Sequence, residues 1–255
     1  MRILMVGDVV GRPGRRAVSA LLPGLRQKYA VDMVIANGEN AAGGAGLTWP
    51  IAQELFQSGV DVLTSGNHIW DQKEIIPYLD KEAPILRPLN YPPGVPGQGF
   101  LTYNGVAVIN LMGRVFMGNL DCPFRAAEGL LKSDEDLPSV IVVDFHGEAT
   151  SEKMALGWYL DGQVSAVVGT HTHVGTVDAR ILPQGTAYIT DVGMVGPRDS
   201  VIGNQREAVI NRFLTQMPSR FPVADGPVVF NAVLLEVAEN TGRATDIHRV
   251  DEKME

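Results

Sequence analysis

Short apolar runs of strand length alternate with longer amphipathic segments along the first third of the chain. The runs cover residues 2–6, 32–36 and 60–65. A helix is predicted over residues 13–29, although Pro23 and Gly24 are expected to break or kink it. A second helix is predicted between the later two runs, because Thr48 suits its cap and Pro50 its first turn. This alternation predicts a parallel sheet covered by helices.

The middle of the chain has a different pattern. Residues 83–99 contain five prolines and three glycines, which predicts a loop. Apolar runs at 100–103 and 106–111 flank Asn104-Gly105, a strong signal for a hairpin. The remaining predicted elements are strands at 139–144, 165–169 and 187–190, helices at 151–160 and 207–216, and a closing hairpin of 228–237 with 243–250.

The chain shows no internal repeat, linker or low-complexity tail. Residues 1–255 are therefore predicted to form a single domain that contains two sheets. Residues 112–125 lack periodicity and are expected to form an irregular cap segment. Asp71 is expected to cap a short helix that runs towards Leu79.

Composition places the chain among globular proteins. Hydrophobic residues make up 45% of it and charged residues 20%, so a sizeable core can form and disorder is excluded. No apolar run reaches the roughly 18 residues of a membrane span, and the N-terminal run is too short for a signal peptide. A cytoplasmic protein is therefore expected. Cys122 is the only cysteine, which excludes an internal disulfide and a zinc–thiolate cage.

Residues with metal-binding side chains gather at the ends of the predicted strands. Parallel strands deliver their carboxyl ends to one edge of a sheet, so these residues are expected to converge. Glycine directly precedes three of them, and glycine permits sharp turns and close backbone approach. The residues are Asp8, Glu39, Asn40, Asn67, His68, His146, His171 and His173. Carboxylate, amide and imidazole groups together form a ligand set for two metal ions.

These residue types suit metal-dependent hydrolysis. Two ions about 3.5–4 Å apart need a bridging oxygen, and Glu39 is the candidate bridge, with Asp8 as a terminal ligand. Alternation along an extended segment would place His171 and His173 on the same side. A water or hydroxide held between the ions would be the nucleophile. His68 directly follows a proposed ligand and would point away from it on extended backbone, which suits a general acid.

Each of these residues also has a structural interpretation. A partly buried histidine often makes only a hydrogen bond, Asp8 could cap the following helix, and Asn40 and Asn67 could favour turns. Independent structural roles would not place four of the five histidines at strand ends beside glycines. The joint pattern therefore favours a metal site.

The net charge of −8 argues against binding along long nucleic acids, which relies on neutralising many phosphates. It is compatible with a small phosphodiester or nucleotide substrate, because metal ions would supply the local positive charge. Arg12, Arg114 and Arg198 follow predicted strands, and for each of them solvated surface charge is favoured over a grip on phosphate.

Four motifs carry a resemblance to a known family. They are GDVVGRPGR, ANGENAAGG, SGNHIWD and GTHTHV. Together they resemble the calcineurin-like metallophosphoesterase superfamily, and most closely its YmdB-like branch of bacterial phosphodiesterases, over nearly the whole chain. The superfamily usually opens with Asp-x-His, where this chain has Val10. Its second motif usually has Asp after Gly, where this chain has Gly38-Glu39-Asn40.

The resemblance implies an α/β fold, a two-sheet sandwich flanked by helices (αββα), and hydrolysis of small phosphodiesters such as cyclic nucleotides. It implies that a bridging hydroxide attacks phosphorus while His68 protonates the leaving group. One ion would be held by Asp8, Glu39, Asn40 and His173. The other would be held by Glu39, Asn67, His146 and His171. Iron or manganese is favoured for these divalent or trivalent ions, zinc also fits, and a homo-oligomeric assembly is left open.

Two other functions compete with this one. A metal-dependent amidohydrolase also uses His-x-His, but its pair comes from an early barrel strand, whereas His171 and His173 lie late in this chain. A metal-binding regulatory or scaffold protein would keep the fold without catalysis, but such a protein has no need of a proton donor such as His68. The sequence therefore favours a metal-dependent phosphodiesterase.

Overall fold

The chain forms two β-sheets in this computed structural model, which describes residues 1–81, 83–133 and 136–255. The strands of the first sheet are β1 (Arg2–Val6), β2 (Asp8–Val9), β3 (Met33–Asn37), β4 (Val62–Thr64), β11 (Met194–Pro197), β12 (Val228–Val237) and β13 (Ala244–Met254). Strands β1, β3 and β4 run parallel, as the predicted strand–helix alternation requires. Strand β12 pairs antiparallel with β1, β11 and β13, and β11 pairs parallel with β2.

The second sheet comes from the middle of the chain. Its strands are β5 (Phe100–Tyr103), β6 (Val106–Met112), β7 (Val140–His146), β8 (Ala166–Thr170), β9 (Arg180–Ile181) and β10 (Ala187–Ile189). Strands β6, β7, β8 and β10 are parallel neighbours. The predicted hairpin joins β5 to β6. Asn104 and Gly105 have φ of 47° and 79°, the left-handed pair that a tight two-residue turn needs.

The helices are α1 (Gly11–Tyr29), α2 (Trp49–Gln57), the 3-10 turn η1 (Lys73–Ile75), α3 (Ile76–Leu79), α4 (Pro123–Ser133), α5 (Thr150–Tyr159) and α6 (Arg206–Thr215). The expected break at Pro23 is wrong, because α1 continues through it. A proline removes one backbone hydrogen bond, and the buried face of α1, which includes Val18, Leu22 and Leu25, holds the helix on the sheet. Helix α4 was not predicted, since the irregular segment before it obscured its start.

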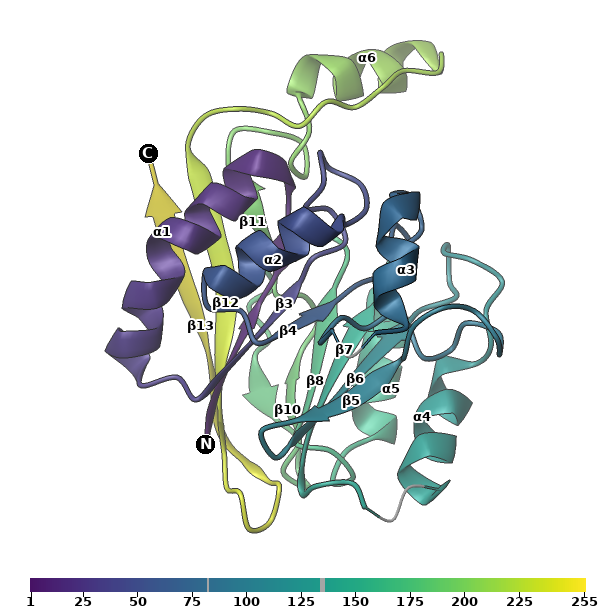
Figure 1. The fold of residues 1–255 in the computed structure, drawn as a ribbon, viewed down its shortest axis with the longest axis vertical. Coiled ribbons are helices and arrows are strands. Elements are labelled where there is room, and N and C mark those ends of the chain that lie inside the picture. Colours follow the sequence, from purple (N-terminus) through teal and green to yellow (C-terminus); the bar gives the residue numbers. More distant parts are fainter. Residues whose placement is uncertain (82, 134–135) are drawn as a thin grey trace.

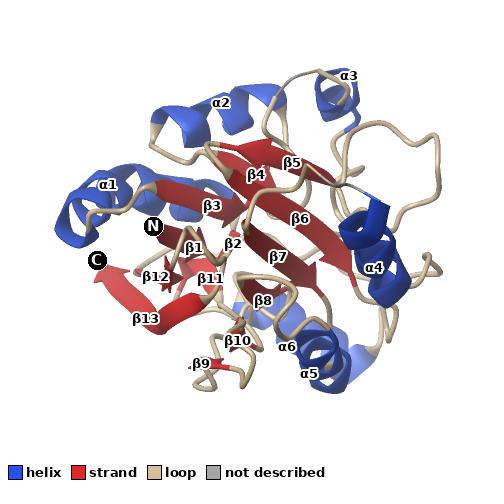
Figure 2. Cartoon of the chain, turned by 90° about the horizontal axis from the view of Figure 1, so that it is seen from below, coloured by secondary structure: helices blue, strands red, loops and turns tan. Residues whose placement is uncertain are grey.

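The two sheets lie face to face between two layers of helices (Figures 1 and 2). Alternate residues of β1 show this directly, because Leu4 packs in the cluster that includes α1 and α2, whereas Met5 packs in the cluster shared with β6 and β7. Helices α4 and α5 cover the outer face of the second sheet around Phe145 and Leu156. The predicted α/β two-sheet sandwich flanked by helices is confirmed.

The edge at which the parallel strands end is where the predicted site residues lie. Strands β3, β4, β7 and β8 all end at one of these residues or within three residues of one, and β2 begins with Asp8. The fold has two open sheets rather than a closed barrel, so it does not provide the scaffold of the amidohydrolase alternative. None of the helices in the described ranges is long and apolar enough to cross a membrane.

Candidate metal centre

One cluster of ligand atoms is centred on His146, the last residue of β7. Its Nε2 atom lies 3.1 Å from Glu39 Oε1, 3.2 Å from Asn67 Oδ1 and 2.9 Å from His171 Nδ1. Glu39, His146 and His171 each offer a carboxylate oxygen or a ring nitrogen, and these three atoms lie within 4.8 Å of one another. Ligands of a single ion with bonds of about 2.0–2.2 Å must lie this close together.

A second group of donors lies next to the first. His173 Nε2 is 3.2 Å from Asn40 Oδ1 and 3.8 Å from Asp8 Oδ1. Asp8 is completely buried, and its Oδ1 atom has no hydrogen-bond partner among the described residues. A buried carboxylate oxygen without a partner is costly, and a cation beside it would remove that cost. The donor set therefore fits a metal ion here as well.

The charges in this buried pocket show why it suits cations. Burial alone would raise the pKa of Glu39, but the adjacent His146 lowers it to about 2. Burial alone would lower the pKa of His146, but Glu39 and Asp8 raise it to about 9. Burial and the same His146 lower the pKa of His171 to about 3. Burial also raises the pKa of Asp8, so the pocket favours a positive charge beside its two carboxyl groups.

A relay of hydrogen bonds orients the His146 ring from behind. Its Nδ1 lies 3.0 Å from Thr170 Oγ1, and that hydroxyl donates to Asp144 Oδ1 at 2.7 Å. Thr64 and Asn37 also donate to Asp144. These bonds place the Nδ1 proton on the side of Thr170 and leave Nε2 facing the ligand cluster, which is how proteins fix a metal-binding imidazole.

The segment with His171 and His173 is not extended, so the expected alternation is wrong. Strand β8 ends at Thr170, and the two histidines have φ of 101° and 63°, in the left-handed region. Both side chains nevertheless reach the site. Thr172 between them donates its backbone N–H and its hydroxyl to Asp191 Oδ2, at 3.1 and 2.8 Å.

A buried ion pair supports this strained segment. Lys153 of α5 is 1% exposed, and its Nζ donates to Asp191 Oδ2 and to the Thr170 carbonyl, both at 2.7 Å. Sequence reasoning missed both partners. Asp191 follows β10 closely, so the rule about strand ends could have found it. No pattern in the sequence distinguishes Lys153 from an ordinary surface lysine.

His68 lies at the wall of a cavity of about 340 Å³, together with Glu39, Asn40, His171 and His173. It occupies a turn rather than extended backbone, and its N–H donates to Glu39 Oε2 at 3.2 Å. Its Nδ1 lies 2.8 Å from Asp71 Oδ2. The predicted capping role of Asp71 is therefore wrong, because its carboxylate binds His68 and the following turn starts after Gln72.

Glycine is required at position 66. An added Cβ atom there would overlap the His146 ring and the Glu39 carboxylate.

Glu148 is a further residue at this site that the sequence did not indicate. Its carboxylate lies 3.2 Å from His171 Nε2, and the residue lines the cavity that also contains His68.

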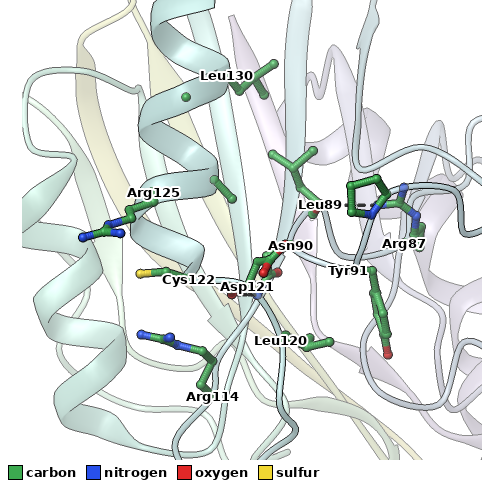
Figure 3. Close-up of a pocket in the computed structure, with 13 residues that line it drawn as sticks. Arg87, Leu89, Asn90, Tyr91, Arg114, Leu120, Asp121, Cys122, Arg125 and Leu130 are labelled. Carbon is green, nitrogen blue, oxygen red and sulfur yellow. Dashed lines mark hydrogen bonds between the residues drawn. The ribbon is translucent and has the colours of Figure 1, made fainter.

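A larger cavity of about 780 Å³ lies beside helix α4 (Figure 3). Arg114 and Arg125 lie on either side of Cys122 there. Arg114 follows β6, whose last residue pairs in register with His146. Arg198, by contrast, is bound to the neighbouring Asp199 at 3.1 Å.

The structure brings all eight predicted residues to one edge of the sandwich. Known proteins share this sequence and fold. The family model described as "YmdB-like protein" matches residues 4–250. The 2',3'-cyclic-nucleotide 2'-phosphodiesterase of Bacillus subtilis (strain 168) is 52% identical over 98% of this chain and 96% of its own length.

Two solved structures are also similar over nearly their whole length. A hypothetical protein from Thermus thermophilus has a TM-score of 0.93 and 48% identity, covering 99% of both chains. A phosphatase from Mycoplasma pneumoniae has a TM-score of 0.93 and 35% identity, covering 99% of this chain and 93% of its own. The chain therefore belongs to the YmdB-like protein family.

Proposed function

We propose that this chain is a phosphodiesterase that uses two metal ions to hydrolyse small phosphodiesters, in particular cyclic nucleotides. The observation that carries the proposal is the convergence of Glu39, Asn67, His146 and His171 within hydrogen-bonding distance at one sheet edge. The family adds support, because one relative is named as a cyclic-nucleotide phosphodiesterase and another as a phosphatase.

The proposed ligand sets share Glu39. One ion would be held by Asp8, Glu39, Asn40 and His173. The other would be held by Glu39, Asn67, His146 and His171. When bound, two such cations would lower the pKa of a water molecule and stabilise negative charge on the phosphoryl oxygens. Iron or manganese is favoured for this set of nitrogen and oxygen donors, and zinc also fits.

His68 is proposed as the general acid. Asp71 accepts the Nδ1 proton and orients the ring, while Nε2 has no partner among the described residues. Only the doubly protonated ring carries a proton on Nε2, and in that form His68 would present it at the wall of the cavity to the leaving alkoxide.

The size of the cavity favours a small substrate. A volume of about 340 Å³ lies at the lower end of the range for small-molecule sites, roughly 300–1,000 Å³. The acidic Glu148 at its wall and the net charge of −8 disfavour a long polyanion. A cyclic nucleotide combines a compact diester with a single negative charge, which suits both features.

The test is the turnover of a 2',3'-cyclic nucleotide by metal-loaded His68→Ala protein. We expect kcat to fall by roughly 10²–10⁴-fold, the usual contribution of a general acid, while bound metal per chain stays constant. Asp71→Asn should lower kcat less, because the acid remains and loses only its orientation. His248→Ala is a matched control, because His248 also binds an aspartate, Asp246 at 2.7 Å, on the exposed strand β13.

The outcomes separate the parts of the proposal. Wild-type activity in His68→Ala would remove His68 as the acid. A wild-type protein that binds metal but hydrolyses neither the cyclic nucleotide nor an activated aryl phosphodiester would favour the regulatory or scaffold function instead.

A further inference from the structure

Glu148 lies in the short connection between β7 and α5. It comes two positions after His146, the last residue of β7, and two before Thr150, the first residue of α5. Its carboxylate lies 3.2 Å from His171 Nε2, and its side chain is 49% exposed. The residue also lines the cavity of about 340 Å³ that contains His68. A carboxylate is therefore held at the wall of the cavity while half of its side chain still faces solvent.

The contact with His171 fixes the position of this carboxylate. The Nδ1 atom of His171 faces His146 Nε2 in the ligand cluster, at 2.9 Å, and its Nε2 atom faces Glu148. An imidazole that turns one nitrogen to a metal carries its proton on the other, and that proton is usually donated to a carboxylate, a carbonyl or water. Glu148 accepts it with one oxygen. Because a singly protonated ring is neutral, this hydrogen bond leaves the negative charge of Glu148 uncancelled.

The charges around the cavity are unusual for a site that takes a phosphate ester. The described residues that line it include Glu39 and Glu148 but no lysine and no arginine. Proteins that bind phosphate tightly commonly use arginine or lysine for it. Glu39 belongs to the proposed ligand set, whereas Glu148 does not. An additional acid at this wall weakens the binding of every anion, and it weakens most the anion with the largest charge.

Phosphodiesters and phosphomonoesters differ in that charge. A diester carries one negative charge, whereas a monoester has a second pKa of about 6 and carries nearly two charges above neutral pH. Hydrolysis of a diester breaks one P–O ester bond and adds water, so the product is a monoester with a further ionisable oxygen. A carboxylate fixed beside the cavity repels that product about twice as strongly as it repels the substrate.

Coulomb's law sets the size of the effect. Two unit charges about 6 Å apart, at an effective dielectric constant of about 40, interact strongly enough to change an equilibrium constant about tenfold. This dielectric constant lies between the value for a protein surface and that for water, which suits a half-exposed side chain. The monoester has one charge more than the diester, so the charge of Glu148 should favour the diester by about this factor.

We infer that Glu148 is a specificity-determining residue, which makes this site select phosphodiesters over phosphomonoesters and helps it to release the monoester product. The inference rests on the proposed function, because it concerns the substrate class of the same site.

The binding of two small anions to metal-loaded protein tests the inference without turnover. Methyl phosphate and dimethyl phosphate are similar in size, but at about pH 8 they carry nearly two charges and one charge. Glu148→Gln removes the negative charge and keeps an oxygen that can accept the His171 Nε2 proton. In isothermal titration calorimetry, the variant should gain about tenfold more affinity for methyl phosphate than for dimethyl phosphate. Its kcat/KM for p-nitrophenyl phosphate, relative to that for bis(p-nitrophenyl) phosphate, should rise by a similar factor.

Asp246→Asn is the matched control. Asp246 is also a half-exposed carboxylate bound to a histidine, with 52% exposure and 2.7 Å to His248 Nδ1, and it does not line the cavity. The control removes the same charge from the chain and should leave both affinities unchanged.

The outcomes separate this inference from the proposed function. Equal gains for the two anions in Glu148→Gln would overturn the inference. Unchanged affinities would overturn it too and would leave Glu148 as a partner that only orients His171, because glutamine preserves that hydrogen bond. In both cases a wild type that hydrolyses the diester would keep the proposed function. A metal-loaded wild type that binds neither anion and hydrolyses neither ester would overturn both.

Discussion

Replacing Lys153 with Met should be among the most damaging changes away from the proposed ligands. Lys153 is 1% exposed, and its ammonium group makes two hydrogen bonds of 2.7 Å, to Asp191 and to the Thr170 carbonyl. Met fills similar volume but leaves Asp191 as a buried carboxylate without its cation. Breaking a buried pair from one side costs roughly 3–5 kcal/mol, a large part of the stability of an ordinary domain.

The measurement is urea unfolding of protein stripped of metal, so that ion binding does not add to the stability. Lys132→Met is the matched control, because Lys132 also lies on a helix and pairs with an acid, Glu128, but is 73% exposed. It should leave the unfolding midpoint nearly unchanged. The double variant Lys153→Met/Asp191→Asn should lose less free energy of unfolding than the sum of the losses in the two single variants, because it leaves neither charge buried without its partner.

A second readout is the affinity for metal. Asp191 holds the backbone between His171 and His173, so loss of its partner should loosen that segment and weaken ion binding. If Lys153→Met unfolds at the same urea concentration as Lys132→Met, and binds metal as the wild type does, the pair does not support the site in the way described here.

Two further predictions concern the ligand cluster itself. Gly66→Ala should lower the amount of metal bound per chain, because its Cβ would overlap His146 and Glu39. Gly24→Ala is the control, since it has open space around it and should bind as much metal as the wild type. Native mass spectrometry measures the bound metal, and equal amounts in the two variants would contradict the geometry. In metal-free protein, the His146 pKa of about 9 exceeds its ordinary value of 6.5. The stability that its proton provides is therefore complete below about pH 6.5 and is lost as pH rises through about 9, and added metal should flatten that profile in denaturant titrations.

The sequence was sufficient for the main elements of the fold, because strand and helix periods impose visible patterns on buried faces. The hairpin at Asn104-Gly105 is a clear case, since few residue pairs adopt its backbone angles. Strands β2 and β9 have two residues each, too few for any period to be visible. Helix α1 passes through Pro23 because tertiary packing outweighs a local preference.

The sequence predicted those site residues whose positions follow from the ends of the strands. Parallel strands bring their ends together whatever the connecting segments do, so Asp8, Glu39 and His146 could be grouped before their contacts were known. The backbone of His171 could not be predicted, because its left-handed angle depends on a carboxylate that follows β10 and a lysine from α5. Such contacts join residues far apart in the chain and leave no local pattern.

The strand that completes the first sheet comes from the far end of the chain. Strand β12 pairs with the whole length of β1, and β11 pairs with β2, which begins with Asp8. A ribosome must therefore synthesise most of the polypeptide before Asp8 acquires its sheet neighbours. For most of translation the nascent chain carries the proposed metal ligands without the sheet that would position them, so ion loading is expected to follow synthesis rather than accompany it.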